Sequence, residues 1–173
     1  MFLAHGVERQ LALCVVHRHF ELEAAEQLVE FNNVVAPWRV AGSPEYLQPG
    51  IQAKNWAFVN GRLFPYEFRF HADVSDAHAF AFSAAFVRDL LDALTEFDLH
   101  NVYGLTALVP DDLDPTTPSL LEFTAGRTNV LLPFTEALEA LARVEASWLF
   151  PCVDPFSGPV KTRLCNLQCV AHR

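Results

Sequence analysis

Two histidines separated by a single residue, His17 and His19, are the side chains of this sequence best suited to carry chemistry. They end the segment LALCVVHRHF, whose composition predicts a β-strand over residues 11–20. Side chains two residues apart on a strand project from the same side, with Cα atoms about 6.5–7 Å apart. Two imidazoles at that separation could hold one metal ion. Glu21 and Glu23 follow closely along the chain.

Three interpretations of this pattern stay open. A divalent transition metal such as Zn or Fe could bind the two imidazoles together with a distant ligand. Without a metal, a neutral imidazole could serve as a general base that a nearby carboxylate orients. In the simplest interpretation, both histidines are hydrogen bonded at a strand end and perform no reaction. The candidate catalytic residues are therefore His17, His19, Glu21 and Glu23, and the candidate metal ligands are His17, His19 and His172.

The spacing of His17, His19 and Glu23 resembles the first half of the cupin metal motif, a histidine pair followed four residues later by a glutamate. This resemblance implies metal binding by these three residues. The sequence departs from the family pattern after Glu23, where the expected glycine is absent. A second cupin motif, with its proline, glycine and histidine, is also missing. The resemblance is confined to residues 17–23 and assigns no family.

A second cluster of possible ligands lies near the C-terminus, where Cys165, Cys169 and His172 follow one another. If this segment is a strand, the two cysteines stand about 13 Å apart and cannot share one ion. Structural, reduced thiols are the favoured interpretation for a cytoplasmic protein. A cysteine would become a nucleophile only if the fold brought a base such as His17 or His19 beside it.

The composition argues against two classes of partner. The chain carries 12 Lys and Arg against 21 Asp and Glu, and its formal net charge is −9. Because binding to phosphates needs a basic patch, we expect no nucleic-acid partner and no anionic membrane surface. No apolar run approaches the roughly 20 residues that span a bilayer. Glu8 and Arg9 interrupt the apolar N-terminus, so we expect no signal peptide and a cytoplasmic location.

The abundance of phenylalanine supports two hypotheses about function. The chain contains 15 Phe but only 3 Tyr, and aromatic side chains fill cores, pockets and interfaces. The first hypothesis is a small metal-dependent or acid–base enzyme with a Phe-lined pocket, centred on His17 and His19, for a small and partly apolar substrate. The alternative is a non-catalytic binding or assembly protein with an exposed aromatic surface, for which a homo-oligomer stays open.

The clearest helical periodicity runs from Ser75 to Asp98. Apolar residues recur there at steps of three or four, and Ser75 is a suitable N-cap. The stripe predicts one long helix, over about residues 75–98, that covers one face of a small sheet. Its inward residues are expected to be Phe82, Phe86, Leu90, Leu94 and Phe97.

A hairpin is predicted over residues 55–70, and two loop lengths are consistent with its sequence. A two-residue loop, Asn60-Gly61, would place Trp56 and Phe58 on the face away from Phe64. A three-residue loop that includes Val59 would collect these aromatics on one face, and we favour it for that reason. The segment SLLEFTAGRTNVLLP predicts a second hairpin.

The remaining segments complete the predicted fold. Thr135 could cap a short helix that ends near Ala146, residues 21–31 fit either a helix or a strand, and a last strand lies within residues 160–172. Strands outnumber helices and connect through hairpins. The predicted class is therefore α+β, with a largely antiparallel sheet packed against one long helix, at about residues 75–98, and one or two shorter helices. We expect a single globular domain over residues 1–173.

Overall fold

The computed structural model describes residues 1–39, 50–72, 80–114, 116–135, 143–150 and 160–166. The helical elements in these ranges are α1 (Phe2–His5), α2 (Ala84–Glu96) and the 3₁₀ turn η2 (Pro110–Leu113). The strands are β1 (Leu11–Val15), β2 (Glu26–Phe31), β3 (Val34–Arg39), β4 (Ile51–Val59), β5 (Arg62–Phe70), β6 (Tyr103–Ala107), β7 (Leu120–Ala125), β8 (Thr128–Pro133), β9 (Arg143–Leu149) and β10 (Val160–Asn166).

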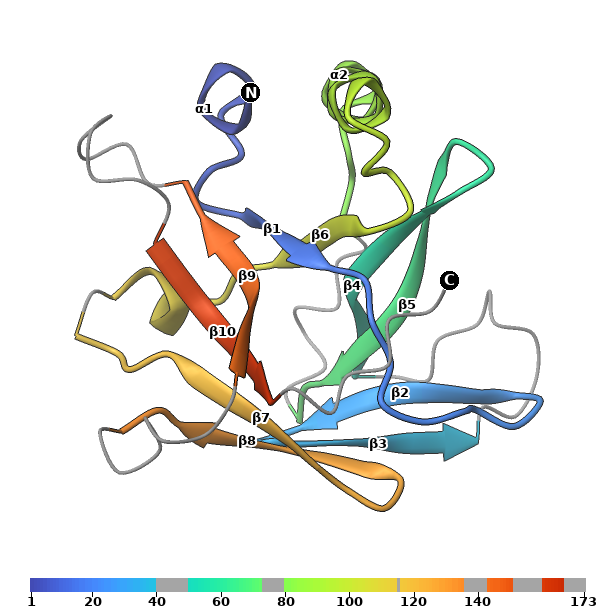
Figure 1. Ribbon diagram of the computed structural model, residues 1–173, viewed down its shortest axis with the longest axis vertical. Coiled ribbons are helices and arrows are strands. Elements are labelled where there is room, and N and C mark those ends of the chain that lie inside the picture. Colours follow the sequence, from blue (N-terminus) through green and yellow to red (C-terminus); the bar gives the residue numbers. More distant parts are fainter. Residues whose placement is uncertain (40–49, 73–79, 115, 136–142, 151–159, 167–173) are drawn as a thin grey trace.

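The strands pair side by side in a closed ring (Figure 1). Their order is β1-β6-β4-β5-β2-β3-β8-β7-β10-β9, and β9 returns to pair with β1. All pairings are antiparallel except those of β2 with β5 and of β7 with β10. The prediction of a largely antiparallel sheet is therefore confirmed. Side chains alternate between the interior of this barrel and its outer surface.

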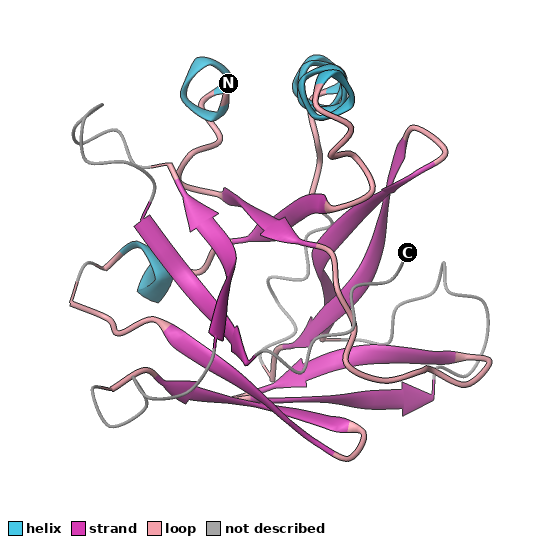
Figure 2. Ribbon diagram, viewed as in Figure 1, coloured by secondary structure: helices cyan, strands magenta, loops and turns pink. Residues whose placement is uncertain are grey.

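The predicted α+β class, with a long helix over residues 75–98 packed on the sheet, is wrong. The described chain is mostly β, and α2 is its only helix longer than seven residues (Figure 2). The sheet curls so that its strands surround their own interior, and a covering helix is not needed there. None of the helices in the described ranges has the length and apolar character required to cross a membrane.

The start of α2 differs from the prediction because aromatic packing holds the preceding residues extended. Phe80 and Phe82 pack against Trp56, with ring centroids 5.7 and 4.9 Å from its ring. Residues i and i+2 share one side of an extended chain but not of a helix. This arrangement is possible only if helix formation is delayed until Ala84. The first part of the predicted helix, residues 73–79, lies outside the described ranges.

The predicted apolar stripe is confirmed for the residues that form α2. Phe86, Leu90 and Leu94 are the buried residues of α2, at the predicted spacing of four. Phe97 was expected to face inward, but its side chain is 69% exposed. The chain leaves the helix at this point, since Asp98 takes the left-handed conformation with φ of 56°.

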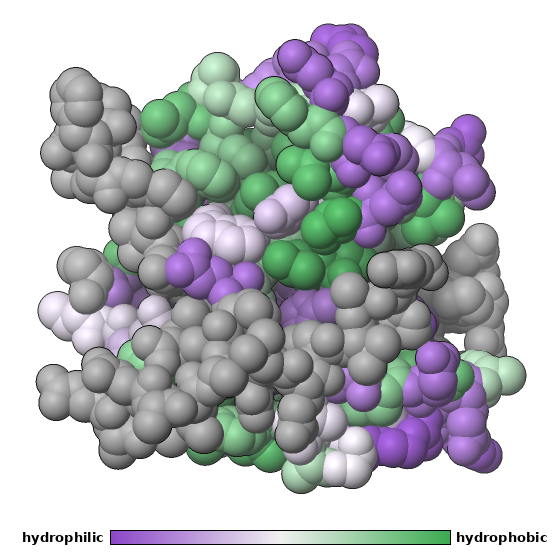
Figure 3. Space-filling view, in the orientation of Figure 1, coloured by the Kyte–Doolittle hydropathy of each residue, from purple (hydrophilic) through white to green (hydrophobic). Residues whose placement is uncertain are grey.

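The largest apolar cluster lies outside the barrel, between its wall and the helices. In Figure 1, α1 and α2 stand above β1 and β6, and apolar residues are visible between and below them in Figure 3. The buried members of this outer cluster are Phe2, Leu11, Trp56, Phe58, Phe86, Leu90, Leu94 and Leu105. Among the exposed apolar residues, Phe31 lies on β2, Phe64 on β5 and Phe97 directly after α2.

The first hairpin has a two-residue loop, so the predicted three-residue loop is wrong. Val59 pairs with Arg62, which leaves Asn60 and Gly61 in the loop. Both take positive φ, 50° and 74°, as a type I′ turn requires. This turn matches the twist of the two strands, and that local preference outweighed the grouping of aromatics. Phe64 therefore lies on the other face from Phe58 and is exposed.

Other predicted elements are corrected as follows. The strand expected over residues 11–20 ends at Val15, and the ambiguous segment before residue 31 forms β2. The helix expected to end near Ala146 is also contradicted at its end, because residues 143–149 form β9. Residues 136–142 lie outside the described ranges. The last strand is described over residues 160–166.

Candidate functional site

The two histidines lie side by side just beyond the end of β1. Their ring centroids are 5.0 Å apart and the ring planes are nearly perpendicular, at 82°. The Nδ1 atom of His17 lies 2.9 Å from the backbone oxygen of Val15. Because a carbonyl oxygen only accepts hydrogen bonds, Nδ1 is the protonated nitrogen of the neutral ring, and in that tautomer Nε2 has the lone pair. The two rings therefore lie beyond the end of β1, in a segment that belongs to neither β1 nor β2.

A buried glutamate on β7, which is separated from β1 in the ring by β9 and β10, completes this group. The Nε2 atom of His19 lies 3.3 Å from Oε1 of Glu122, and their side chains are only 2% and 6% exposed. One ligand atom from each of His17, His19 and Glu122 lies within 4.8 Å of the other two. We refer to these three residues as the His-His-Glu group.

Neighbouring side chains orient Glu122 within its strand. The Nδ2 atom of Asn129 donates a hydrogen bond of 2.6 Å to Oε1 of Glu122. Thr124 Oγ1 in turn donates to Oδ1 of Asn129 at 3.0 Å. Thr124 and Asn129 are paired across β7 and β8, so the backbone register sets this chain of bonds. Such support is typical of carboxylates that bind metals.

Sequence reasoning missed Glu122, although a signal was present. Glu122 interrupts the apolar run Leu120-Leu121-Glu122-Phe123, and Glu30 interrupts the similar run Leu28-Val29-Glu30-Phe31. A charged residue within an apolar strand is buried only when it is paired. Both carboxylates are buried. This pattern could have marked them as interior residues, but it could not have shown which of them meets the histidines.

Glu21 and Glu23 do not belong to the His-His-Glu group. Both are exposed. Glu23 accepts a 2.8 Å hydrogen bond from Nη2 of Arg39, and the backbone oxygen of Glu21 accepts one from Arg127 at 3.1 Å. The proposed role of these glutamates as partners of the histidines stays a prediction that their positions do not support.

Arg127 ties the segment after the histidines to the turn of the β7–β8 hairpin. Its guanidinium forms an ion pair with Glu26 at the start of β2. This hydrogen bond holds the pKa of the Glu26 carboxyl below its ordinary value. The same contact raises the pKa of Arg127. The two ends of the segment that carries His17 and His19 are therefore held by β1 and by Arg127.

The other predicted ligands fall outside this group or outside the described ranges. Residues 167–173 contain Cys169 and His172, and both lie outside the described ranges. Cys165 lies on β10, which pairs with β7, and its backbone is in register with Glu122. Cys14 is buried, with its Sγ atom 3.9 Å from the hydroxyl of Tyr66.

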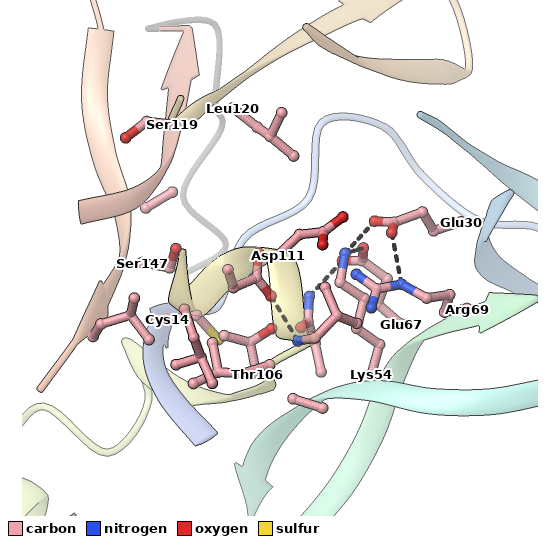
Figure 4. Close-up of a pocket in the computed structure, with 18 of the residues that line it drawn as sticks. Cys14, Glu30, Lys54, Glu67, Arg69, Thr106, Asp111, Ser119, Leu120 and Ser147 are labelled. Atoms are coloured by element: carbon pink, nitrogen blue, oxygen red, sulfur yellow. Dashed lines mark hydrogen bonds and ion pairs between the residues drawn. The ribbon is translucent and has the colours of Figure 1, made fainter. Parts of the chain in front are cut away.

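A cavity of about 1030 Å³ occupies the barrel and includes His17 in its wall. Figure 4 shows Glu30, Lys54, Glu67 and Arg69 on one side of this cavity, with Cys14, Ser119 and Ser147 on the other. Leu120 also lines it, and Glu122 follows two residues later on the same face of β7. Phe70 is the only phenylalanine among the described lining residues, so the wall is more polar than predicted.

The polar wall contains a buried network of four charges. Lys54 forms an ion pair with Glu30, and its Nζ atom lies 3.6 Å from Oε1 of Glu67. Arg69 donates from Nε to Oε1 of Glu30 at 2.8 Å. Buried charges persist only when they are paired in this way. The barrel interior is therefore organised by ion pairs instead of apolar packing at this end.

Irregular pairing of β4 with β5 turns additional polar side chains inward. The register shifts between Ala53 and Asn55 and again between Asn55 and Trp56. A bulge re-aims side chains and breaks strict alternation. Consecutive residues on both strands, Lys54 with Asn55 and Tyr66 with Glu67, consequently line the same cavity.

A small residue on β6 permits the close approach of β4. A Cβ atom on Gly104 would lie only 2.1 Å from the backbone oxygen of Trp56. Any other residue at position 104 would displace the wall that separates the cavity from the outer cluster. Gly104 is therefore required by backbone proximity.

These features define a mostly β, barrel-forming protein with a polar cavity and a group of two histidines and one carboxylate whose ligand atoms converge. No family model, curated protein or solved structure matches this chain.

Proposed function

We propose that this protein binds one divalent transition metal ion through His17, His19 and Glu122. We further propose that the metal serves a reaction on a small molecule held in the barrel cavity. The observation that carries this proposal is the convergence of three ligand atoms within 4.8 Å of one another, from two parts of the chain about a hundred residues apart. Two imidazoles and one carboxylate suit zinc or iron.

The distances fit such a centre after a small movement. Ligands at about 2.0–2.1 Å from a tetrahedral zinc ion lie about 3.3–3.4 Å from one another. The His19–Glu122 separation of 3.3 Å already has this value. The remaining separations are at most 4.8 Å and would close through small shifts of the three side chains. The backbone contact of its Nδ1 atom leaves Nε2 available for the ion.

The position of His17 supports a reactive rather than a purely structural ion. Three protein ligands leave at least one coordination position for water or substrate. Because His17 lines the cavity, that position would be accessible to a molecule bound there. An ion in this position would polarise a substrate oxygen or activate a water molecule.

The contact between His19 and Glu122 favours a second candidate function that needs no metal. A carboxylate 3.3 Å from an imidazole nitrogen could orient the ring for general acid–base catalysis. The hydrogen bond from Asn129 would hold that carboxylate in place. In this case, activity would persist when metals are removed.

Metal content of the purified, untagged protein tests the first candidate. We expect close to one equivalent of zinc, iron or added cobalt, with cobalt giving the visible absorption of a low-coordinate site. His17→Ala, His19→Ala and Glu122→Gln should each lower the metal affinity at least tenfold. His71→Ala and Glu96→Gln are matched controls outside the His-His-Glu group and should retain the metal.

Two outcomes would contradict the metal proposal. One is a folded wild-type protein that takes up no zinc, iron or cobalt. The other is equal metal content in the three site variants and the two controls. Circular dichroism of each variant would separate loss of metal from loss of fold.

A further inference from the structure

Three polar side chains form a continuous shelf on the cavity wall. Asn55 on β4 is in register with Thr106 on β6 and with Glu67 on β5. Paired residues on neighbouring strands share one face of a sheet. All three are buried and line the cavity.

The orientation of the Asn55 amide is determined by its neighbour. Its Nδ2 atom donates a hydrogen bond of 2.7 Å to Oε2 of Glu67. A carboxylate only accepts, so the amide nitrogen must face Glu67 and the amide oxygen must face elsewhere. Within the described ranges, no hydrogen-bond donor reaches that Oδ1 atom, although the residue is only 5% exposed.

A second oxygen on the cavity wall is also buried without a hydrogen-bond donor among the described residues. The Oε2 atom of Glu8 is buried and has no hydrogen-bond partner among the described residues. A buried acceptor without a donor loses its hydrogen bonds to water and gains none in the protein, which is unfavourable. Two such acceptors on one cavity indicate a ligand that supplies donors.

The charges of the cavity wall also favour a ligand that donates hydrogen bonds. Its described carboxylates outnumber its basic residues by six to three. The carboxylates are Glu8, Glu30, Glu67, Asp111, Asp112 and Asp114, and the basic residues are Arg9, Lys54 and Arg69. Lys54 and Arg69 are already engaged by the interior glutamates.

Two of the three aspartates in the lining are engaged by the backbone of their own loop. Asp112 accepts a hydrogen bond from the amide of Val109, and Asp114 accepts one from the amide of Thr116. Asp111 is exposed and lines the cavity (Figure 4). Asp111 is thus an exposed carboxylate on the cavity wall that would attract a cationic molecule.

The geometry points to a small organic amine, in its ammonium form, as the molecule that the cavity binds. This inference rests on the proposed function, because it takes the cavity as the place of the substrate. An alkylammonium group has three N–H donors and no acceptor. It would satisfy the amide oxygen of Asn55 and the carboxylate of Glu8, and its charge would offset the acidic lining.

Three four-carbon probes distinguish this inference from its alternatives. We expect isothermal titration calorimetry to show binding of 1,4-diaminobutane to the full chain at pH 7. Binding of 1,4-butanediol should be at least tenfold weaker, and succinate should not bind. The affinity for the diamine should also fall as salt is added. Equal binding of the diol, preferential binding of succinate, or no binding of the diamine at 10 mM would each overturn the inference.

Variants separate this inference from the metal proposal. Asn55→Leu and Glu8→Gln should each weaken diamine binding at least fivefold, whereas Glu96→Gln, a surface control, should not. If Asn55→Leu fails to fold, the Glu8→Gln variant alone tests the inference. An unchanged affinity of that variant for the diamine contradicts it. His17→Ala should lose the metal yet retain diamine binding. Loss of both in His17→Ala would show that the amine binds the metal itself and would overturn the inference.

Discussion

Strands β1, β4 and β6 present different chemistry on their two faces. Toward the helices, they contribute Leu11, Trp56 and Leu105 to the apolar outer cluster. Toward the barrel interior, they contribute Cys14, Asn55 and Thr106 to the cavity wall. The same three strands thus support an apolar core on one side and a polar cavity on the other.

This difference indicates that the outer cluster mainly stabilises the fold, whereas the barrel interior is suited to binding. Burial of the outer cluster supplies hydrophobic stabilisation of about 25 cal/mol for each Å² removed from water. The interior network contributes little net stability, since ion pairs must offset the cost of removing charges from water. The interior consequently keeps polar groups and open volume that a fully packed core would lack.

The largest effect is expected from breaking the interior network at its centre. Lys54→Met would leave the buried carboxylates of Glu30 and Glu67 without their shared cation. We expect a loss of about 3–5 kcal/mol in the free energy of unfolding, because an uncompensated charge would remain buried. Urea unfolding followed by circular dichroism would measure it.

The matched control for this prediction is Arg62→Met, which removes an exposed cation from the β4–β5 hairpin. Its expected effect is below about 0.5 kcal/mol. A loss below 1 kcal/mol in Lys54→Met would mean that water reaches the network, and the contrast between the two regions would then be weaker than we propose.

An intermediate effect is expected in the outer cluster. Phe86 is almost completely buried on α2 and packs against Phe2 of α1, with ring centroids 5.4 Å apart. Phe86→Leu should lower the free energy of unfolding by about 1–2 kcal/mol through lost apolar burial. Differential scanning calorimetry would measure the change. Metal and diamine binding should be unaffected, and an altered affinity would show that the two regions are coupled.

The smallest effect is expected where the two helices meet at the surface. His5 of α1 donates a hydrogen bond of 3.0 Å to Asp89 of α2, and this contact holds the pKa of Asp89 below its ordinary value. A carboxyl whose pKa is lower in the folded state stabilises the protein above its unfolded pKa, here 3.8. That stabilisation is lost as the pH falls through the folded pKa.

Comparison of the wild type with Asp89→Asn tests this pH dependence. The wild type should be slightly more stable at pH 5, and the difference should shrink as the pH falls below 3.8 and Asp89 becomes protonated. Thermal unfolding across this pH range would follow it. A stability difference that grew on acidification would show that the contact with His5 does not stabilise the ionised form of Asp89.

Local sequence patterns predicted the features that depend on neighbouring residues alone. The spacing of Phe86, Leu90 and Leu94 identified the buried face of a helix, and the predicted hairpins identified a largely antiparallel sheet. The Asn60-Gly61 turn was also recognised, although a longer loop was preferred. The same patterns could not show that Phe80 and Phe82 would pack on Trp56 and delay the helix.

The candidate site was predicted only in part. His17 and His19 were chosen from their types and spacing, but their third partner, Glu122, comes from a strand about a hundred residues away. Which strands become neighbours depends on closure of the ring, and local propensity contains no information about that order. The bulges that turn Lys54 and Asn55 inward depend likewise on the pairing of β4 with β5.

The sequence by itself determined which residues are too polar to be buried alone, among them Glu30, Lys54 and Glu122 within apolar strands. Only the tertiary structure decided how these residues are paired, because burial favours any arrangement that neutralises them. The ring order and strand register selected one arrangement. They brought Glu122 to the histidines and Glu30 to Lys54.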